Sequence, residues 1–179
     1  MRKLLNEELG RLDVAAFKKA TKIPIKVVLD NVRSLNNIGS AFRTSDAFRV
    51  EAVYLCGITA RPPHREIQKT ALGATESVEW EYFATTANAV DNLRAEDYQI
   101  IVVEQADESV ELQEFKINVD KKYALVFGNE VKGVDEKIVK DADEVVEIPQ
   151  FGTKHSLNIA VSIGVVLWGL WVKFQKTDK

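Results

Sequence analysis

The chain has 179 residues, of which 46% are hydrophobic and 28% are charged, a balance typical of one soluble globular domain. Its single cysteine, Cys56, cannot form an internal disulfide, and with only two histidines beside it the chain offers no metal-ligand cluster. These numbers argue against a disulfide-stabilised secreted domain and a structural zinc module, and they predict a cytoplasmic protein without a metal.

The net charge of −3 is unevenly distributed. Residues 1–69 contain 13 Lys and Arg against 7 Asp and Glu, a net charge of +6, whereas residues 70–179 contain 11 against 20, a net charge of −9. A basic N-terminal part is compatible with a phosphate-rich partner. An uneven but solvated surface explains the same numbers, and on charge alone it is the favoured explanation.

Apolar runs rich in β-branched residues alternate with segments of helical periodicity. We expect residues 1–24 to form a short helical extension packed on a domain over residues 25–179. In chain order, this domain is expected to contain a strand at 26–30, a helix at 37–48 capped by Asn36 or Asn37, a strand at 52–57, a helix at 65–72 that stops at Gly73, a strand at 78–83, a helix at 86–93, strands at 99–103 and 123–128, a helix at 135–140, a strand at 144–148 and a final helix at 156–174. The alternation predicts an α/β fold with a mainly parallel sheet and helices on both faces.

The final helix contains an uncharged run from Ile159 to Val172. These 14 residues are too few to cross a bilayer, which takes roughly 20. A helix that is apolar nearly all round must be buried on several sides, and Trp168 and Trp171 are large for the surface of one domain. The run therefore predicts a subunit interface and no membrane span.

Polar residues cluster at three junctions between an expected strand and the following helix. In the first, Asn37 and Arg43 lie at the start and middle of a helix, where a helix N-terminus and a guanidinium together suit an anion. A capping Asn and a helix-face Arg explain this segment equally well.

The second junction is residues 127–135, in which Gly128 and Gly133 flank a turn that leaves a central strand. Val134-Asp135 replaces the Lys-Ser/Thr that a P-loop needs, and no G-x-G-x-x-G occurs, so both nucleotide fingerprints fail. The third junction is residues 148–162, where a strand is followed by proline, glycine and then Ser156-Leu157-Asn158 at the expected start of the last helix. Each junction alone could be an ordinary turn.

Taken in order, the three junctions resemble the three motifs of the SpoU (TrmH-like) RNA 2′-O-ribose methyltransferases of the SPOUT superfamily. The matching residues are Asn37 and Arg43-Thr44, then residues 125–130 with Gly133, then Ile148-Pro149, Gly152, Ser156-Leu157-Asn158 and Ser162. The motifs span residues 31–162, which is most of the chain. The resemblance implies an S-adenosylmethionine-dependent enzyme that methylates a ribose 2′-hydroxyl of tRNA or rRNA.

The resemblance also implies a C-terminal deep trefoil knot, whose loops hold S-adenosylmethionine largely through main-chain groups, and a homodimer with its active site near the subunit interface. By position, the cofactor-binding residues are Phe127, Gly128, Asn129, Gly133, Ile148, Gln150, Gly152, Ser156 and Leu157. The positions that match the catalytic motif residues of the family are Asn37, Arg43, Glu130, Ser156 and Asn158.

Arg43 matches the catalytic arginine of the family. Because arginine practically never loses its proton, we expect Arg43 to stabilise the incipient alkoxide and to orient the adjacent RNA phosphate. Asn37 and Glu130 are expected to fix Arg43 or the ribose, and Ser156 and Asn158 to shape the shared pocket.

The expected partner is structured RNA, and the residues expected to contact it are Arg33, Arg43, Arg61, Arg65 and Lys154. Lys154-His155 departs from the small acidic or hydrophobic residue that many relatives have before Ser-Leu-Asn. These two side chains could contact phosphate, His155 could assist proton transfer, or both could form a surface cap. We also expect no separate RNA-recognition domain, which leaves the first 25 residues to serve that role.

Two other classes compete with the enzyme. A catalytically inactive RNA-binding protein of the same fold is disfavoured because the motif residues are all present. A nucleotide-dependent enzyme on a doubly wound sheet is disfavoured because both nucleotide fingerprints are missing.

Overall fold

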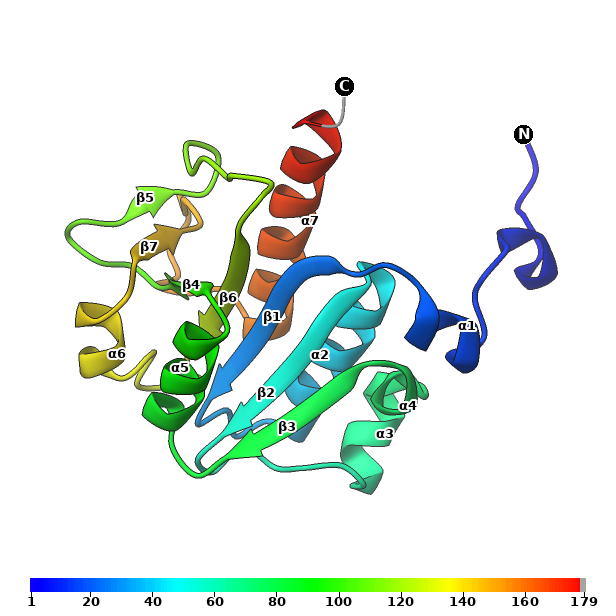
Figure 1. The fold of residues 1–179 in the computed structure, drawn as a ribbon, viewed down its shortest axis with the longest axis horizontal. Coiled ribbons are helices and arrows are strands. Elements are labelled where there is room, and N and C mark those ends of the chain that lie inside the picture. Colours follow the sequence, from blue (N-terminus) through cyan, green and yellow to red (C-terminus); the bar gives the residue numbers. More distant parts are fainter. Residues whose placement is uncertain (178–179) are drawn as a thin grey trace.

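The computed structural model describes residues 1–177, whose centre is a seven-stranded sheet in the order β3-β2-β1-β6-β4-β7-β5 (Figure 1). Every pair of neighbouring strands is parallel. The strands are β1 (Ile23–Asp30), β2 (Val50–Cys56), β3 (Glu79–Phe83), β4 (Tyr98–Val103), β5 (Val110–Glu111), β6 (Lys122–Phe127) and β7 (Glu144–Glu147). Parallel strands need crossover connections, and helices supply most of them.

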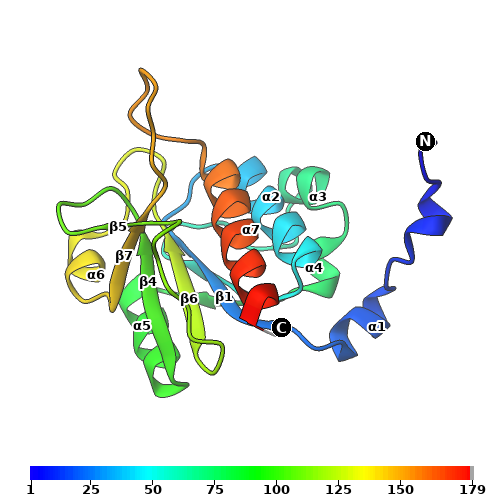
Figure 2. The same cartoon turned by 90° about the horizontal axis from the view of Figure 1, so that it is seen from above.

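Helices cover both faces of the sheet, as Figures 1 and 2 show. The helices are η1 (Asn6–Leu9), α1 (Val14–Lys19), α2 (Leu35–Ala47), α3 (Arg65–Ala71), α4 (Ala74–Ser77), α5 (Thr86–Ala95), α6 (Glu136–Lys140) and α7 (Ile159–Thr177). Helices α2, α3, α4 and α7 lie on one face, and α5 and α6 lie on the other. The predicted α/β class with a parallel sheet is confirmed.

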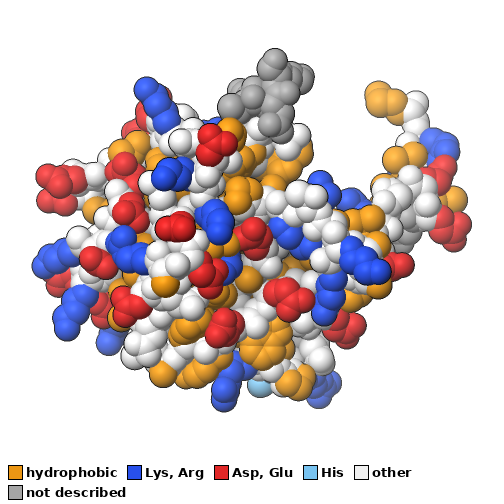
Figure 3. All heavy atoms as spheres, in the orientation of Figure 1, with side chains coloured by type: hydrophobic (Ala, Val, Ile, Leu, Met, Phe, Trp, Pro, Cys, Tyr) orange, Lys and Arg blue, Asp and Glu red, His pale blue; other side chains and the backbone are white. Residues whose placement is uncertain are grey.

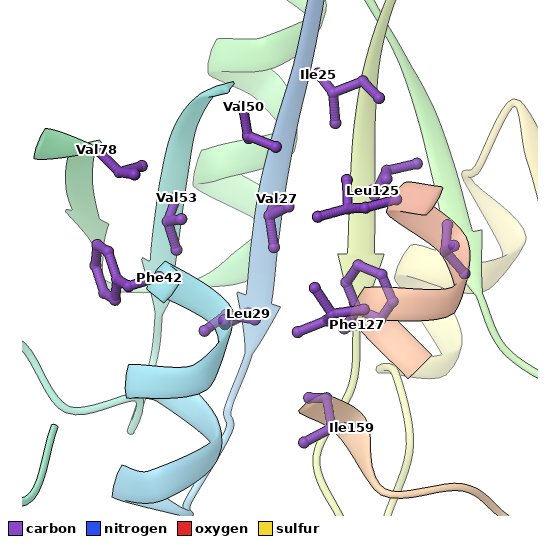
Figure 4. Close-up of a cluster of buried hydrophobic side chains, with 14 of the residues drawn as sticks. Ile25, Val27, Leu29, Phe42, Val50, Val53, Val78, Leu125, Phe127 and Ile159 are labelled. Carbon is purple, nitrogen blue, oxygen red and sulfur yellow. The ribbon is translucent and has the colours of Figure 1, made fainter. Parts of the chain in front are cut away.

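The core consists of two layers of apolar side chains, one on each face of the sheet. On β1, Val27 and Leu29 pack beneath α2 and α7, whereas Val28 between them packs beneath α5, and all three are fully buried. Figure 4 shows the first layer, with Leu125 and Phe127 of β6 beside the β1 side chains. A strand buried on both faces needs a continuous apolar run, which is the pattern that predicted this strand.

The starts of α2, α6 and α7 differ from the sequence expectation, α6 by one residue because Asp135 caps it. Helix α2 is capped by Ser34, whose Oγ accepts a hydrogen bond from the backbone N of Asn37 at 3.3 Å, rather than by Asn36 or Asn37. Helix α7 begins at Ile159 rather than Ser156, because Asn158 takes the capping position. The Asn158 Oδ1 accepts from the backbone N of Ala160 at 2.9 Å. Ser156 and Leu157 are therefore part of an irregular segment that leads into the helix.

The N-terminal segment, expected as a short helical extension packed on the domain, forms two short helices, of which only α1 packs on the domain. Phe17 of α1 is buried and belongs to the core layer that includes Ala71 and Ala74. Residues 1–5 and 7–13 are exposed, and η1 extends away from the sheet (Figure 2). In the view of Figure 3, basic and acidic side chains are interspersed over the surface, so no single-sign patch dominates this face.

Candidate active site

The polar junctions that the sequence indicated meet at one edge of the sheet, where the parallel strands have their carboxyl ends. The loops after β1, β4, β6 and β7 all lie there, because parallel strands that run in the same direction also end at the same edge. Asp30, the last residue of β1, is buried and helps to hold these loops. Its Oδ2 accepts from the backbone N of Asp135 at 2.9 Å, and its Oδ1 accepts from the Asn31 Nδ2 at 2.7 Å and from the Thr86 hydroxyl.

A cavity of about 580 Å³ opens at this edge, between the β6–α6 loop and the segment that connects β7 to α7. This volume lies within the ~300–1,000 Å³ of small-molecule sites. Eight of the nine residues expected to hold the cofactor line the cavity: Phe127, Gly128, Asn129, Gly133, Ile148, Gln150, Ser156 and Leu157. Gly152, the ninth, is exposed and is not among the lining residues.

The two glycines of the β6–α6 loop are required by its geometry. A Cβ on Gly128 would lie 2.1 Å from the carbonyl carbon of Gly133, and a Cβ on Gly133 would lie 2.3 Å from the Glu104 Oε2. Gly133 also has a φ of +70°, a conformation that glycine adopts without strain. Glycine is therefore needed at position 128 because the neighbouring backbone leaves no room for a Cβ, and at position 133 because of the positive φ.

Asn129 fixes the same loop with its side chain. Its Nδ2 donates to the carbonyl oxygen of Asn31 at 2.7 Å, and its Oδ1 accepts from the backbone N atoms of Val131 at 2.9 Å and Lys132 at 3.1 Å. Backbone hydrogen bonds in both directions join Asn129 to Gly133. Asn129 thus shapes the cavity wall.

Three of the expected catalytic residues form one hydrogen-bonded chain beside the cavity. The Glu130 Oε1 accepts from the Asn37 Nδ2, and the Asn37 Oδ1 accepts from the Asn158 Nδ2, each at 3.2 Å. Glu130 also accepts from the backbone N atoms of Arg33 at 3.0 Å and Ser34 at 2.9 Å. The chain joins the starts of α2 and α7 to the β6–α6 loop.

The carboxylate of Glu130 is ionised in this setting. Partial burial alone would raise its pKa, but the hydrogen bonds from the backbone of Arg33, Ser34 and Glu130 itself and from Asn37 outweigh burial and lower the pKa below its ordinary value. Because both oxygens already accept hydrogen bonds, Glu130 is suited to hold Asn37 in place and is poorly suited to take a proton.

Arg43 lies apart from this chain of contacts. Arg43 is exposed on α2 and lines a second hollow of about 310 Å³ together with residues of α1 and α4. Ser156, the remaining residue expected to be catalytic, lines the first cavity. Within residues 1–177, no hydrogen bond or ion pair joins Arg43 to Asn37 or Glu130. The structure therefore does not bring Arg43 to the first cavity.

The other residues expected to contact RNA are exposed at or near the carboxyl edge. Arg33 follows β1, whereas Arg61 and Arg65 follow β2. The Arg61 guanidinium stacks on the Tyr82 ring, with its Cζ 4.5 Å from the ring centroid. Lys154 is exposed in the segment between β7 and α7. All of these cations are accessible to a large anionic partner.

The sequence motifs missed part of the cavity wall. Glu104 and Gln105 line the cavity directly after β4, and the Glu104 carboxylate accepts from the backbone N of Val134 at 3.2 Å. The Gln105 Nε2 donates to the carbonyl oxygen of His155 at 2.9 Å, which holds the β7–α7 segment against β4. The sequence feature that could have indicated Glu104 and Gln105 is their position directly after a central parallel strand, because ligand sites of α/β sheets lie at the carboxyl ends of the strands.

Two absences apply to the described residues. Their His, Cys, Asp and Glu side chains form no group of three or more that could hold a metal ion. None of their helices combines the length and the apolar character that a bilayer crossing requires.

The model of the SpoU rRNA methylase family matches residues 24–168 of the chain. The chain belongs to this family. A tRNA (guanosine(18)-2′-O)-methyltransferase of Aquifex aeolicus is 32% identical over 171 residues, which are 92% of this chain and 76% of that protein. The 23S rRNA (guanosine-2′-O-)-methyltransferase RlmB of Neisseria meningitidis is 33% identical over 145 residues, which are 80% of this chain but only 56% of that protein.

Solved structures of SpoU proteins have the same fold. The crystal structure of the A. aeolicus TrmH/SpoU tRNA modifying enzyme matches with a TM-score of 0.78 and 27% identity, covering 90% of this chain and 80% of that chain. An AdoMet-bound rRNA methyltransferase from Sinorhizobium meliloti matches with a TM-score of 0.77 and 27% identity, covering 86% of this chain and 58% of that chain. The resemblance seen in the three motifs is confirmed at the level of the family.

Proposed function

We propose that this SpoU-family protein transfers a methyl group from S-adenosylmethionine to a ribose 2′-hydroxyl of tRNA or rRNA. The observation that supports this most directly is the cavity between the β6–α6 loop and the β7–α7 segment, which the second and third motifs line together. Relatives named as tRNA and rRNA 2′-O-methyltransferases support the same reaction. Substrates of this kind favour the cytoplasmic location that we propose with it.

The residues of the cavity suit S-adenosylmethionine. Glu104 and Glu147 place two carboxylates in a wall that also includes Lys132, and this set complements a ligand with a sulfonium, an ammonium and a carboxylate. Phe127, Ile148 and Leu157 supply apolar surface for the adenine ring. When bound, the cofactor would supply the activated methyl group.

The residues of the chain prepare the hydroxyl that receives the methyl. Asn37 and Asn158, held by the ionised Glu130, would orient the ribose at the mouth of the cavity. As the 2′-hydroxyl gives up its proton to solvent water, the guanidinium of Arg43 would stabilise the negative charge that develops on the oxygen, since it stays protonated throughout. Neither role requires a metal ion.

We further propose that the protein is a homodimer in which Arg43 acts at the cavity of the partner subunit. Helix α7 exposes an apolar row, with 51% of Val161, 38% of Val165 and 55% of Trp168 accessible. Arg43 is exposed on α2, which packs against α7, and does not line its own cavity. A twofold interface over α7 would cover this row and bring α2 near the other subunit.

Co-expression of two inactive variants tests the shared site. If Arg43 acts across the interface, a mixed population of Arg43→Ala and Asn158→Ala chains has one complete site in each heterodimer and recovers about a quarter of the wild-type activity. If Arg43 acts within its own subunit, the mixture stays inactive.

We also infer that the C-terminal part is tied in a trefoil knot. Strand β7 lies between β4 and β5, although it follows both in the chain. The segment after β5 contacts α7, because the Lys173 Nζ donates to the carbonyl oxygens of Leu112 at 2.9 Å and Gln113 at 3.1 Å. The strand order and the hydrogen bonds of Lys173 both support passage of residues 128–177 through the loop formed by residues 104–121.

Labelled S-adenosylmethionine and total RNA test the function. We expect label to enter RNA at a 2′-O-methylated nucleotide, which mapping then identifies as part of tRNA or rRNA, and calorimetry to show cofactor binding. RNA binding without cofactor binding would instead establish the inactive RNA-binding protein.

A further inference from the structure

The segment between β7 and α7 contacts the cavity twice and leaves it in between. Ile148 and Gln150 line the cavity, and so do His155, Ser156 and Leu157, but residues 151–154 do not. Figure 2 shows this segment, in orange, projecting beyond the carboxyl edge of the sheet. The projecting part begins with Phe151, which is 96% exposed.

A phenyl ring exposed to this degree is unusual, because aromatic side chains normally bury most of their surface. None of the described residues covers Phe151, and apart from its two chain neighbours Gly152 has no heavy atom within 4 Å of where its Cβ would be. The ring is therefore accessible to a ligand. The next charged side chain in the segment, Lys154, is exposed as well.

We propose that Phe151 stacks on a nucleobase of the substrate RNA beside the ribose that receives the methyl group. The inference rests on the proposed function and adds a positioning residue to it. RNA-binding proteins commonly stack unpaired bases on aromatic rings, and a phenyl ring accepts any base because every base has a flat π-face. Lys154, three residues further on, supplies a charge for the adjoining phosphate.

The position of the segment determines what the contact does. Because its two ends are parts of the cavity wall, a base held at Phe151 would keep the neighbouring ribose at the cavity mouth, near Asn158. The ring has no polar atom, so it would position the nucleotide without distinguishing one base from another. Base preference would then depend on other residues.

Four substitutions in the full-length protein separate stacking from plain apolar contact. Phe151→Trp and Phe151→Tyr keep a flat ring, Phe151→Leu keeps apolar volume without one, and Phe151→Ala removes both. We expect the Ala and Leu variants to raise the KM and the Kd for RNA about tenfold, which is within the roughly 5- to 150-fold range for loss of one base–aromatic stack. The Trp and Tyr variants should have KM and Kd values within about threefold of wild type. The Kd for S-adenosylmethionine should not change.

The measurements use transcribed tRNA and transcribed ribosomal RNA in separate titrations, with Val119→Ala as a control for loss of an exposed apolar side chain outside the cavity. Light scattering reports the oligomeric state of each variant. The proposal is wrong if Phe151→Leu binds RNA as well as wild type, or if Phe151→Ala weakens RNA binding only by dissociating a dimer. Failure of the proposed function would be seen separately, because the wild-type protein would then transfer no methyl group to RNA. The RNA titrations would still measure the effect of Phe151 on RNA binding.

Discussion

At the scale of single residues, Glu130 and Arg43 have opposite surroundings. Glu130 is held by two backbone N–H groups and by Asn37, and its charge is fixed by these donors. Arg43 is exposed and lines a hollow away from the cofactor cavity. One residue is therefore part of the framework of the site, and the other is free to act on a ligand or a second subunit.

Glu130→Gln should lower kcat by tenfold or more, because it removes the charge that orders Asn37, with a much smaller effect on cofactor affinity.

The difference in stability between wild type and Glu130→Gln should also depend on pH. The pKa of Glu130 is lower in the folded than in the unfolded chain, so its stabilising contribution is complete above the ordinary Glu pKa of about 4.3 and is lost as pH falls through the folded value. The difference in unfolding free energy between wild type and variant should shrink over that range in acid titrations followed by circular dichroism. A difference that stays constant down to pH 2 would contradict this account.

Arg43→Lys should keep a small part of the methyl-transfer activity, because a cation remains without the planar fork of donors, and Arg43→Ala should keep almost none. Both variants should bind S-adenosylmethionine like wild type, since Arg43 does not line the cavity. Single-turnover methylation and calorimetry measure the two effects. An Arg43→Ala enzyme as active as wild type would remove Arg43 from the mechanism.

At the scale of elements, the sequence predicted the strands and helices whose burial is continuous or periodic. The apolar run of β1 and the helical spacing of Ile38, Ala41, Phe42 and Ser45 on α2 match their burial in the structure. Strand β5 has only two residues, Val110–Glu111, which is too short to produce a pattern. The start of α7 was misplaced because Ser156 and Asn158 can both cap a helix, and only hydrogen bonding distinguishes them.

The candidate site was predictable where motif residues line it. Gly128, Gly133 and Leu157 were expected at the cavity and are found there, whereas Glu104 and Gln105 belong to no motif and reach it only because β4 ends beside β6. Strand order depends on contacts distant in sequence, which local patterns do not contain. The separation between Arg43 and Asn37 has a local cause, because six residues place two side chains about 120° apart around a helix such as α2.

The β6–α6 loop offers a matched set of substitutions. Gly128→Ala and Gly133→Ala should each destabilise the protein by about 1–3 kcal/mol, because a Cβ at position 128 would overlap the backbone of Gly133 and alanine at position 133 would be strained at a φ of +70°. Gly152→Ala, at a position with no neighbour within 4 Å, should change the unfolding free energy by no more than about 0.5 kcal/mol. Urea denaturation gives all three values. Equal stability of the three variants would show that the loop does not need its close backbone approach.

At the scale of the whole molecule, two aromatic rings of α7 and the ring of Phe48, which follows α2, form a partly exposed cluster. The rings of Trp168 and Trp171 stack with centroids 5.3 Å apart, and Phe48 lies 6.3 Å from Trp168. Trp168 remains 55% exposed at the C-terminal end of the row that begins with Val161 and Val165. Exposed apolar patches of this kind are typical of subunit interfaces.

Trp168→Glu should convert the proposed homodimer to a monomer at micromolar concentration, because a carboxylate would be buried without a partner. Analytical ultracentrifugation measures the change, and methyl transfer should fall with the dimer fraction. Asn88→Glu adds the same charge to the exposed surface of α5 on the opposite face and should leave the mass unchanged. A dimer that persists in Trp168→Glu would place the interface elsewhere.

The insertion of β7 between two earlier strands has a consequence during translation. Until residues 144–147 leave the ribosome, one edge of β4 has no neighbour, and an open edge strand of a nascent chain is prone to aggregate. The walls of the cofactor cavity extend from Val103 to Ser162, so they too are incomplete until late in synthesis. We therefore expect chains arrested before residue 144 to aggregate unless a chaperone binds them, and the cavity to bind the proposed cofactor only after Ser162 has been synthesised.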